Sequence, residues 1–593
     1  MNILSVTERK WILREYSVED VKFIKNNFFL DEITSKLLAI RNIKKEDIKN
    51  YLNPTLKNIL PNPNCLKDMN KACSRLIQSI NKNEKIGILG DYDVDGAAST
   101  ALLGNYFNNI NQNYEIYIPD RKTEGYGPSE KGFQNLIDKG VKIIFTVDCG
   151  TLSFEPIDYA ISKGVDVVVL DHHQSDTKLP NAHSIVNPNR LDDNSNLNYL
   201  CAAGVCFMFL ISLNMELRKA QWFIKNKIQE PNLINFLDLV SLGTVCDVVP
   251  LVGLNRAIVK QGLKVLKSKR NIGLSTLLNI CKIEKDPTTY ELGYILGPRI
   301  NAGGRVGKCS HGANLLLNMS PRDSFNLAIQ LDNYNKERQL LEKELLSKVL
   351  EDLKNYSDPV VLISGENWHE GVIGIIASRI KDKFNKPTII ISTNDKIGKA
   401  SARSIVGFDI GAAIIGAVQS GILLKGGGHK MAGGFSIEDS KIKDFKKYII
   451  QKFKNQNNNL LEEKKVYVDS IISPSALNID FYNKIFNLAP FGSGNTEPKF
   501  VIESVKTLNS KIVGEKHIKS TLLGQDGSSI QTISFNATDS NIGAYLLKKS
   551  KETFNIVGKL SLNEWKGKKK VEFIIDDISV NKKHKNMVPS SIG

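Results

Sequence analysis

Three aspartates at alternate positions, in the stretch GDYDVDG at residues 90–96, have the types and spacing to hold a divalent metal ion. Carboxylates this close repel one another unless a positive charge offsets them, and a divalent cation supplies that offset. An aspartate-rich turn is one alternative, because Asp and Gly favour turns. A calcium loop is another, but the sequence lacks the helix–loop–helix frame and the closing Glu of an EF-hand.

Acidic residues also follow two further apolar runs that are typical of buried strands. Asp148 comes directly after the run at 142–147, and an Asp-His-His triplet begins at Asp171, directly after the run at 165–170. A fourth acid, Asp247, stands where a predicted helix gives way to a loop. Because ligands gather at the carboxyl ends of strands in an open parallel sheet, we expect the acids that follow strands to meet at one edge.

The resulting set is rich in carboxylate oxygen and contains one imidazole. Hard oxygen ligands with one nitrogen suit Mn²⁺ or Mg²⁺ better than zinc. Adjacent histidines can also be satisfied members of a core, but the chain has only eight histidines and two of them adjoin an aspartate at a strand end. That placement favours a functional role. The candidate metal ligands are Asp93, Asp95, Asp148, His172 and Asp247.

Strand and helix patterns alternate around these acids, which predicts βαβ units and a mostly parallel sheet. The helix expected from about Ala97 directs its N-terminus at the acids, where its free amides and partial positive charge favour an anion. The expected strands are 86–89, 142–147 and 165–170, and the expected helices are 97–108, 129–139, 155–163, 199–219 and 231–245.

Other patterns divide the rest of the chain. A helical pattern with an N-cap and a proline at its first position, Ser320-Pro321, predicts a helix that connects two lobes, although an ordinary surface helix is an alternative. Strand–helix alternation restarts after it, and short alternating strands then predict a small all-β barrel. The predicted parts are an N-terminal helical segment (1–60, with helices at 17–29 and 31–40), a parallel-sheet domain (61–320), the connecting helix (321–355), a second α/β domain (356–455), the barrel (460–580) and a basic tail (581–593).

The 593 residues carry a formal net charge of +16, which favours polyanionic partners because each phosphate contact releases counterions. The chain is also crowded with Lys, Asn and Ile, so a compositional drift of the whole proteome explains the charge equally well. The eight cysteines form no CxxC pair, which indicates reduced thiols rather than disulfides or a zinc knuckle. The charged N-terminus and the lack of a long apolar run predict a soluble, cytoplasmic protein.

The motifs DYDVDG, VDCG, DHH and CDVVP, in this order, resemble the four signature motifs of the DHH phosphoesterase family. A single DxDxDG would be weak evidence, whereas the ordered set is specific. The resemblance covers residues 60–580 and narrows to the RecJ exonucleases of that family through the stretches PDRKTEGYG (119–127), GPRINAGGR (297–305), WHEGVIGIIASR (368–379), SARS (401–404), GGGHKMAGG (426–434) and APFGSGNTEP (489–498).

This resemblance implies a DHH parallel-sheet domain, a DHHA1 domain beyond the long helix and a C-terminal OB-fold domain. It also implies a 5′-to-3′ exonuclease that degrades single-stranded DNA to 5′-mononucleotides with two divalent ions, in recombination and repair. Phosphodiester hydrolysis also agrees with the metal site itself, whereas the DNA substrate and its polarity rest on the resemblance. Helicases and single-strand-binding protein are the partners that the resemblance implies.

The resemblance divides the metal ligands between two ions. Asp93 would hold one ion, and Asp148 would bridge both. Asp95, His172 and Asp247 would hold the other ion.

The resemblance assigns further residues to the reaction. Asp91 would support the metal-binding loop rather than ligate, and His173 would lie at the scissile phosphate. Arg121, just after an apolar run, could neutralise that phosphate, although a solvated loop arginine is the alternative.

A second group resembles a pocket for a terminal 5′-phosphate. Arg305, Ser401 and Arg403 offer guanidinium and hydroxyl donors, which suit a dianionic end. Gly428 and His429 belong to a glycine run that resembles the substrate-contacting motif of the DHHA1 domain, and glycine lets backbone amides approach a phosphate closely. A flexible turn is the alternative for this run.

The predicted barrel could bind single strands with basic grooves and stacking aromatics. Alternatively, its aromatics are core and its lysines form a solvated edge. The residues concerned are Lys511, Lys516, His517, Lys519, Phe535, Trp565, Lys566, Lys568, Lys569 and Lys570.

Two rival functions stay open. Other DHH relatives hydrolyse short oligonucleotides or cyclic dinucleotides, but they lack a third domain, so segment 465–580 argues against that function. A scaffold that binds without cutting would need lost metal ligands, and none is lost here.

Overall fold

The computed structural model describes residues 3–121, 123–317, 320–456, 464–548, 552–565 and 567–580. The chain divides into two compact units, which we call the barrel unit (1–60, 250–260 and 462–593) and the two-sheet unit (61–249 and 261–461). Within the described ranges, no helix has both the length and the apolar character needed to span a membrane.

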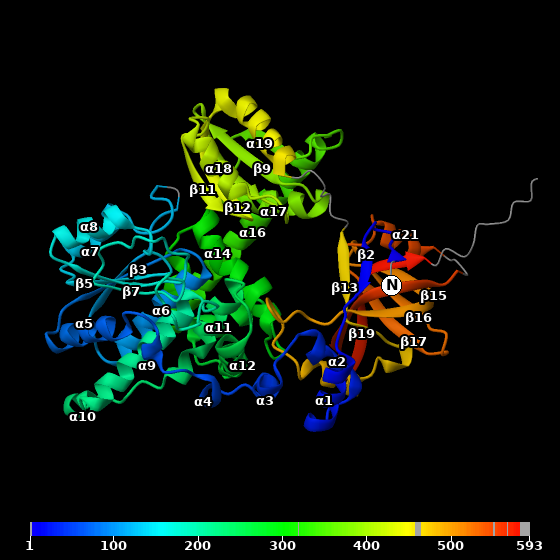
Figure 1. The fold of residues 1–593 in the computed structure, drawn as a ribbon, viewed down its shortest axis with the longest axis horizontal. Helices are drawn as coiled ribbons and strands as arrows, with labels where there is room; N and C mark the ends of the chain where they lie inside the picture. Colours follow the sequence, from blue (N-terminus) through cyan, green and yellow to red (C-terminus); the bar gives the residue numbers. More distant parts are fainter. Residues whose placement is uncertain are drawn as a thin grey trace, which may run out of the picture. The chain divides into compact units, whose positions relative to one another are not determined.

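The first sheet of the two-sheet unit is five-stranded, entirely parallel and ordered β4-β3-β5-β6-β7. In Figure 1, α7 and α8 cover one of its faces, and α5, α6 and α9 cover the other. The strands are β3 (Ile86–Gly90), β4 (Tyr114–Tyr117), β5 (Ile143–Val147), β6 (Asp166–Leu170) and β7 (Ser184–Val186). The covering helices are α5 (Met69–Asn81), α6 (Val94–Asn109), α7 (Glu130–Asp138), α8 (Phe154–Ser162) and α9 (Ala202–Lys219).

The register of this sheet brings the acidic motifs together. Gly90 pairs with Val147, and Val147 pairs with Leu170, so three strands end at the same level. The next residue on each strand is Asp91, Asp148 or Asp171. The predicted meeting of the acids at one edge of a parallel sheet is confirmed.

Helix α6 begins at Val94 rather than at the predicted Ala97, because the side chain of Asp93 caps it. Asp93 Oδ1 accepts hydrogen bonds from the backbone N–H groups of Asp95 (2.9 Å) and Gly96 (3.0 Å). A Cβ atom on Gly96 would lie 2.6 Å from the carbonyl oxygen of Asp91, so only glycine permits this tight turn. The capped turn fixes the positions of the first two motif acids relative to the third.

Further helices complete the first α/β domain. They are α10 (Trp222–Asn226), α11 (Leu237–Cys246), α13 (Ile272–Ile280), the π-helix η4 (Glu291–Leu296), α14 (Gly297–Val306) and α15 (His311–Leu316). Helix α12 (Gly253–Lys267) begins in the barrel unit and ends in the two-sheet unit. The predicted helix at 231–245 is present as α11, preceded by the short 3₁₀ helix η3 (Leu233–Phe236).

The predicted connecting helix is α16 (Pro321–Asp352), whose 32 residues span about 48 Å. Ser320 caps it by accepting a hydrogen bond from the backbone N–H of Asp323 at 3.2 Å. Its first half packs against α13, α14 and α15, and its apolar C-terminal half joins a core that includes Ile376 and Ile390. The helix therefore links the two α/β domains, as Figure 1 shows.

The second sheet has the order β11-β12-β10-β9-β8, with β8 and β9 parallel and the other pairs antiparallel. The glycine run forms its edge strand β11 rather than a flexible turn. The strands are β8 (Val361–Glu366), β9 (Thr388–Asn394), β10 (Ile397–Arg403), β11 (Lys425–His429) and β12 (Ala432–Glu438), with helices α17 (Glu370–Phe384), α18 (Ile410–Gln419), α19 (Ile442–Gln456) and η5 (Asp439–Lys441).

The barrel unit contains the predicted all-β barrel. Its sheet has the order β14-β15-β16-β17-β19-β18, and a further pairing of β15 with β18 closes it. Strand β15 begins at Phe500, and its first three residues are all buried. The strands are β14 (Ser470–Ile471), β15 (Phe500–Val513), β16 (His517–Leu523), β17 (Ser529–Ser534), β18 (Phe554–Trp565) and β19 (Lys568–Val580), with helices η6 (Pro474–Ala476), α20 (Ile479–Phe486) and α21 (Asn541–Leu547).

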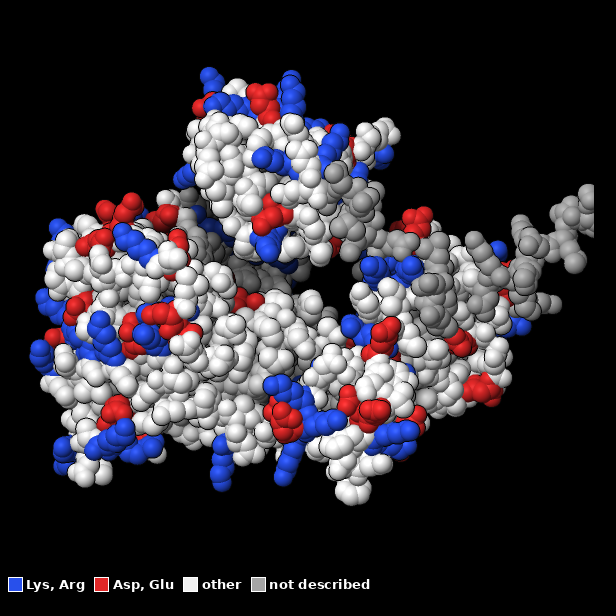
Figure 2. All heavy atoms as spheres, in the orientation of Figure 1, with Lys and Arg blue, Asp and Glu red and all other residues white. Residues whose placement is uncertain are grey.

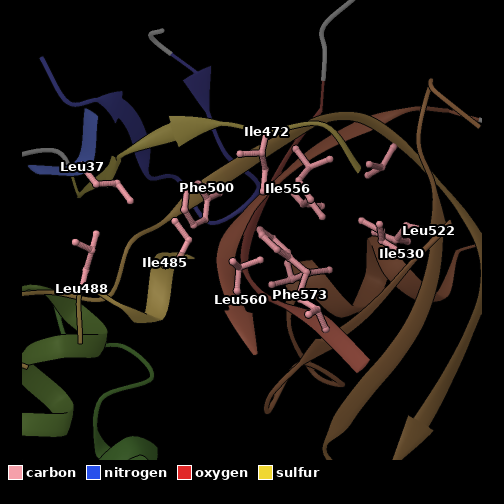
Figure 3. Close-up of a cluster of buried hydrophobic side chains, with 14 of the residues drawn as sticks. Leu37, Ile472, Ile485, Leu488, Phe500, Leu522, Ile530, Ile556, Leu560 and Phe573 are labelled. Atoms are coloured by element: carbon pink, nitrogen blue, oxygen red, sulfur yellow. The ribbon is translucent and has the colours of Figure 1, made fainter. Parts of the chain in front are cut away.

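The prediction that residues 1–60 form a helical segment is only partly correct, because the segment also contains strands. Strands β1 (Ile3–Leu4) and β2 (Lys10–Leu13) precede its helices, and β2 pairs in parallel with the distant strand β13 (Lys465–Val468), a pairing that local patterns cannot reveal. Leu37, on α2, points into the same apolar cluster as Ile485 and Phe500 of the barrel (Figure 3). The helices here are α1 (Val18–Phe28), α2 (Glu32–Ile40), η1 (Lys45–Asp47), α3 (Ile48–Leu52) and α4 (Leu56–Ile59), and η2 (Pro63–Cys65) follows in the two-sheet unit.

Candidate metal centre and phosphate pocket

Carboxylates and imidazoles from four segments meet at the carboxyl edge of the first sheet. His172 lies centrally, with its Nε2 atom 3.3 Å from Asp148 Oδ1 and 3.6 Å from Asp247 Oδ2. Asp247 is the C-cap residue of α11, which brings it to the cluster from outside the sheet. Three groups have ligand atoms within 4.8 Å of one another: Asp91 with Asp93 and Asp148, Asp95 with His172 and Asp247, and Asp148 with His172 and His173.

Several of these carboxylates are buried without the donors that a buried carboxylate requires. The Oδ1 atoms of Asp91 and Asp148 accept no hydrogen bond from the described part of the chain. Burial is the main cause that raises the pKa of Asp91 to about 8, and the negative charge of Asp93 is the second. The same two causes raise the pKa of Asp148 well above its usual range. Burial, followed by the charge of Asp95, raises the pKa of Asp247 to about 8. A divalent cation removes these penalties, so the residues fit such an ion.

Asp95 is held in place by two helices. Its carboxylate accepts hydrogen bonds from the backbone N–H groups of Ala202 (2.6 Å) and Ala203 (3.0 Å), at the N-terminus of α9. On its other side, a Cβ atom on Gly243 of α11 would lie 2.4 Å from Asp95 Oδ1. Glycine at this position lets α11 approach closely enough to present Asp247.

Asp171 acts on its neighbours rather than presenting a free carboxylate. Its Oδ1 accepts hydrogen bonds from the backbone N–H of His172 (2.7 Å) and from Nδ1 of His173 (2.7 Å), and its Oδ2 accepts one from the hydroxyl of Thr151 (2.6 Å). Burial alone would raise the pKa of Asp171, but the bond to His173 holds it below the usual range. Burial would likewise lower the pKa of His173, and Asp171 instead raises it to about 9.

Sequence reasoning missed Tyr126, which stands in the stretch PDRKTEGYG. Its hydroxyl donates to the backbone carbonyl of Asp148 at 3.0 Å and lies 2.9 Å from Nε2 of His173. It also missed Asn187, whose amide donates to the carbonyl of His173 at 2.9 Å. A tyrosine in a turn and an asparagine after a short strand carry no chemical signal by themselves. Only their contacts show that they hold His173 in place.

Arg305 and Arg403 lie close together with Arg121. Arg305 is half-buried and donates to the carbonyl of Gly371 at 3.1 Å, and the half-buried Arg403 donates to Ser401 Oγ at 3.1 Å. Burial and the charge of Arg121 lower the pKa of Arg305 to about 10 and also lower that of Arg403. Within the described ranges no carboxylate pairs with Arg305 or Arg403. Half-buried guanidinium groups without a carboxylate partner are suited to bind an anion.

Gly428 and His429 do not join this group directly. They lie on the edge strand β11, where both are exposed. Arg403 and His429 both pair with Ala432 of the intervening strand β12, so they lie two strands apart. With neighbouring strands about 4.8 Å apart, that separation is about 10 Å.

The candidate DNA-binding residues of the barrel fall into different environments. Lys519 is paired with Glu572 at 2.7 Å, which leaves it less available. Phe535 is 52% exposed, and its ring packs edge-on against His517 at 5.2 Å between centroids. A groove of about 430 Å³ is lined by Lys569 and Lys570 together with Asp480 and Gln531. Lys566 and the side chain of Trp565 lie outside the described residues, as does the predicted basic tail.

Acidic and basic side chains are interspersed over the face shown in Figure 2. The net charge of +16 is therefore not gathered into one basic surface there. This explains why charge alone could not locate a path for a polyanion.

Three family models match the chain in sequence order. They are the "DHH family, N-terminal domain" at residues 85–244, the "DHHA1 domain" at 357–455 and the "RecJ OB domain" at 468–577. These matches fall on the parallel sheet, the second sheet and the barrel.

The chain is similar along most of its length to characterised exonucleases. It is 32% identical to the single-stranded-DNA-specific exonuclease RecJ of Escherichia coli, over 93% of this chain and 96% of that protein. It is 28% identical to the enzyme of the same name from Bacillus subtilis, over 97% of this chain and 71% of that protein.

Solved structures of RecJ proteins are also similar to this chain. Thermus thermophilus RecJ in complex with Mn²⁺ matches with a TM-score of 0.79 and 25% identity, covering 96% of this chain and 79% of that one. An exonuclease RecJ bound to manganese matches with a TM-score of 0.56 and 29% identity, covering 65% of this chain and 94% of that one.

Proposed function

Since the chain belongs to the RecJ family of single-stranded-DNA-specific exonucleases, we propose that it degrades single-stranded DNA from the 5′ end to 5′-mononucleotides. The reaction is metal-dependent phosphodiester hydrolysis, and its place is in DNA recombination and repair. One observation carries the proposal: among the described residues, the oxygen-rich cluster with its unpartnered carboxylate oxygens lies in the same unit as a group of arginines without carboxylate partners.

The cofactors are two divalent ions, Mn²⁺ or Mg²⁺. Bound at the cluster, such ions generate a hydroxide nucleophile and stabilise the leaving oxygen of an in-line displacement. Asp95, His172 and Asp247 would hold one ion, Asp93 the other, and Asp148 would bridge both. The closeness of Asp148 to both sets of ligand atoms supports this division.

We propose a different role for Asp91 from the one that the family resemblance implies. Its carboxylate belongs to the group with Asp93 and Asp148, and its buried Oδ1 accepts no hydrogen bond from the residues that the structure describes. The backbone N–H groups of Tyr92 and Asp93 interact with this carboxylate, and they still leave Oδ1 free to ligate a cation. We therefore propose Asp91 as an additional ligand of the ion held by Asp93.

We propose that the Nε2–H group of His173 donates a hydrogen bond to the scissile phosphate. Asp171 binds its Nδ1, which fixes the orientation of the ring and directs Nε2 at the hydroxyl of Tyr126. A phosphate oxygen that replaced this hydroxyl would accept a hydrogen bond from Nε2. Arg121, whose guanidinium lies over the ring of Tyr92, would neutralise the same phosphate.

Arg305, Ser401 and Arg403 would bind the terminal 5′-phosphate. Their shared location, with Arg403 bonded to Ser401 and both arginines close to Arg121, supports a single dianion site. A terminal phosphate held at a fixed distance from the metal cluster selects an end, which makes the enzyme an exonuclease. Gly428 and His429, on the exposed edge strand, would contact the strand further along.

The experiment is digestion of a 5′-phosphorylated, 3′-fluorescent single-stranded oligonucleotide in Mn²⁺, with EDTA and blunt-duplex controls. Loss of nucleotides from the 5′ end, abolished by EDTA and absent on the duplex, is the expected result. Cleavage only of dinucleotides or cyclic dinucleotides would instead identify a phosphodiesterase of small substrates. The match of the barrel to the RecJ OB domain favours the first outcome.

We further propose that the enzyme acts in the cytoplasm with a helicase that supplies single strands and with single-strand-binding protein. Family membership supports this, and all eight cysteines are free thiols. Co-purification of the wild-type chain with either partner, resistant to nuclease treatment, tests the association.

A further inference from the structure

A π-helix lies beside the metal centre. Glu291–Leu296 adopt this conformation and run directly into α14, whose last turn carries Arg305. It is the only π-helix in the described part of the chain. Such segments are rare and are frequently found at functional sites.

One side of the π-helix is firmly anchored. Glu291, which is 1% exposed, accepts hydrogen bonds from the backbone N–H (2.8 Å) and the hydroxyl (2.7 Å) of Thr288. Leu292 is fully buried, and its carbonyl accepts a hydrogen bond from Cys246 Sγ at 3.4 Å. Cys246 is the last residue of α11, and Asp247 is the next. The π-helix therefore packs against the turn that presents a proposed metal ligand.

The other side of the π-helix exposes two aromatic rings. Tyr290 is 57% exposed and Tyr294 is 73% exposed. Their rings are stacked, with centroids 5.1 Å apart and planes at 28°. The stacked pair therefore presents a continuous aromatic surface to solvent.

A second unusual backbone feature lies at the same end of α11. Val248 has a φ of 62° and is 67% exposed. A β-branched residue in the left-handed region is strained, and strain of this kind clusters where a ligand is bound. The π-helix therefore contacts Cys246, the residue before Asp247, and the strained Val248 is the residue after Asp247.

We propose that Tyr290 and Tyr294 form a stacking platform for a nucleobase of the single strand whose phosphate lies at the metal centre. This inference rests on the proposed function and adds a base-contacting site to it. Neutral aromatic rings suit the faces of bases rather than phosphates, and such stacking tolerates any sequence. The π-helix ties the platform to Asp247 through α11 and to Arg305 through α14, so a strand held at both points passes a fixed aromatic surface.

The test compares wild type with the double variant Tyr290→Ala/Tyr294→Ala on 5′-phosphorylated strands in Mn²⁺. One set of strands is unmodified, and the others carry a single abasic spacer at successive positions from the second nucleotide onward. Phe325→Ala, which removes another exposed ring from the same unit, is the matched control, and Tyr290→Phe/Tyr294→Phe keeps the aromatic faces. Thermal unfolding shows whether each variant is folded.

We expect the alanine variant to raise KM for the unmodified strand about tenfold, the size of one base–aromatic stack, with little change in kcat. In wild type, one spacer position should produce the same rise, and the alanine variant should show no additional rise there. The phenylalanine variant and Phe325→Ala should resemble wild type.

An unchanged KM in the alanine variant would overturn the proposed stacking platform. A spacer effect that is as large in this variant as in wild type would also overturn it. Those results would leave the exonuclease intact. Failure of the wild-type chain to degrade any strand would instead reject the proposed function, so the two failures are distinct.

Discussion

Nδ1 of His173 donates a hydrogen bond to Oδ1 of Asp171 at 2.7 Å, and the same oxygen accepts from the backbone N–H of His172. The aspartate of the Asp-His-His triplet therefore orients both histidines. Asp171→Asn should lower kcat on single-stranded DNA about 10–100-fold, as is typical when a partner that orients a catalytic or ligating group is lost. Asp176→Asn, at an exposed position nearby, is the control, and equal kcat for both variants would contradict this role.

Arg305 and Arg403 should determine the preference for a 5′-phosphate. Either arginine changed to alanine should reduce the ratio of kcat/KM for 5′-phosphorylated over 5′-hydroxyl strands about tenfold, the worth of one charge-assisted hydrogen bond. The exposed Arg322→Ala provides the control. A ratio that stays at the wild-type value in both variants would show that the terminal phosphate binds elsewhere.

Arg256 is a stability determinant of the barrel unit. It is 1% exposed and donates to the backbone carbonyls of Tyr51, Leu488, Ala489 and Pro490. Arg256→Ala leaves several buried acceptors without a donor, at about 1–3 kcal/mol each, so we expect a loss of about 3 kcal/mol or more in the free energy of unfolding. Urea unfolding measures it, with the exposed Arg270→Ala as control. A loss no larger than that of the control would refute this assignment.

Much of the metal centre was predictable because it depends on local signals. An apolar run followed by an acid, repeated along the chain, is sufficient to predict that Asp91 and Asp148 lie near Asp171 once the sheet is parallel. The pairing of β2 with β13 was not predictable, because each strand has only four residues and its partner lies at the other end of the sequence. Tyr126 was also not predictable from local sequence, because its role depends on the contacts that its hydroxyl makes with the distant residues Asp148 and His173.

Asp238 should make the stability of the chain depend on pH. It is buried at the start of α11, its Oδ2 accepts no hydrogen bond from the described residues, and burial raises its pKa to about 7. Between the unfolded value near 3.9 and this folded value, the folded state binds more protons, so stability falls as pH rises through that window. Asp238→Asn cannot ionise, so it should raise Tm relative to wild type at pH 8 but not at pH 4.

Thermal unfolding of both proteins across this pH range measures the effect. The difference in Tm between Asp238→Asn and wild type should grow from pH 4 to pH 7 and then level off. A difference that is constant over the range would show that Asp238 is not protonated in the folded chain.

Calorimetric titration of Mn²⁺ into the wild-type chain and Asp148→Asn, paired with nuclease assays, tests the two-ion site most directly. The wild type should bind two ions per chain. The variant should lose at least one of them and lose hydrolysis by more than the roughly 100-fold that an outer partner contributes. Asp148→Asn that still binds two ions and degrades single-stranded DNA at the wild-type rate would contradict the proposed metal centre.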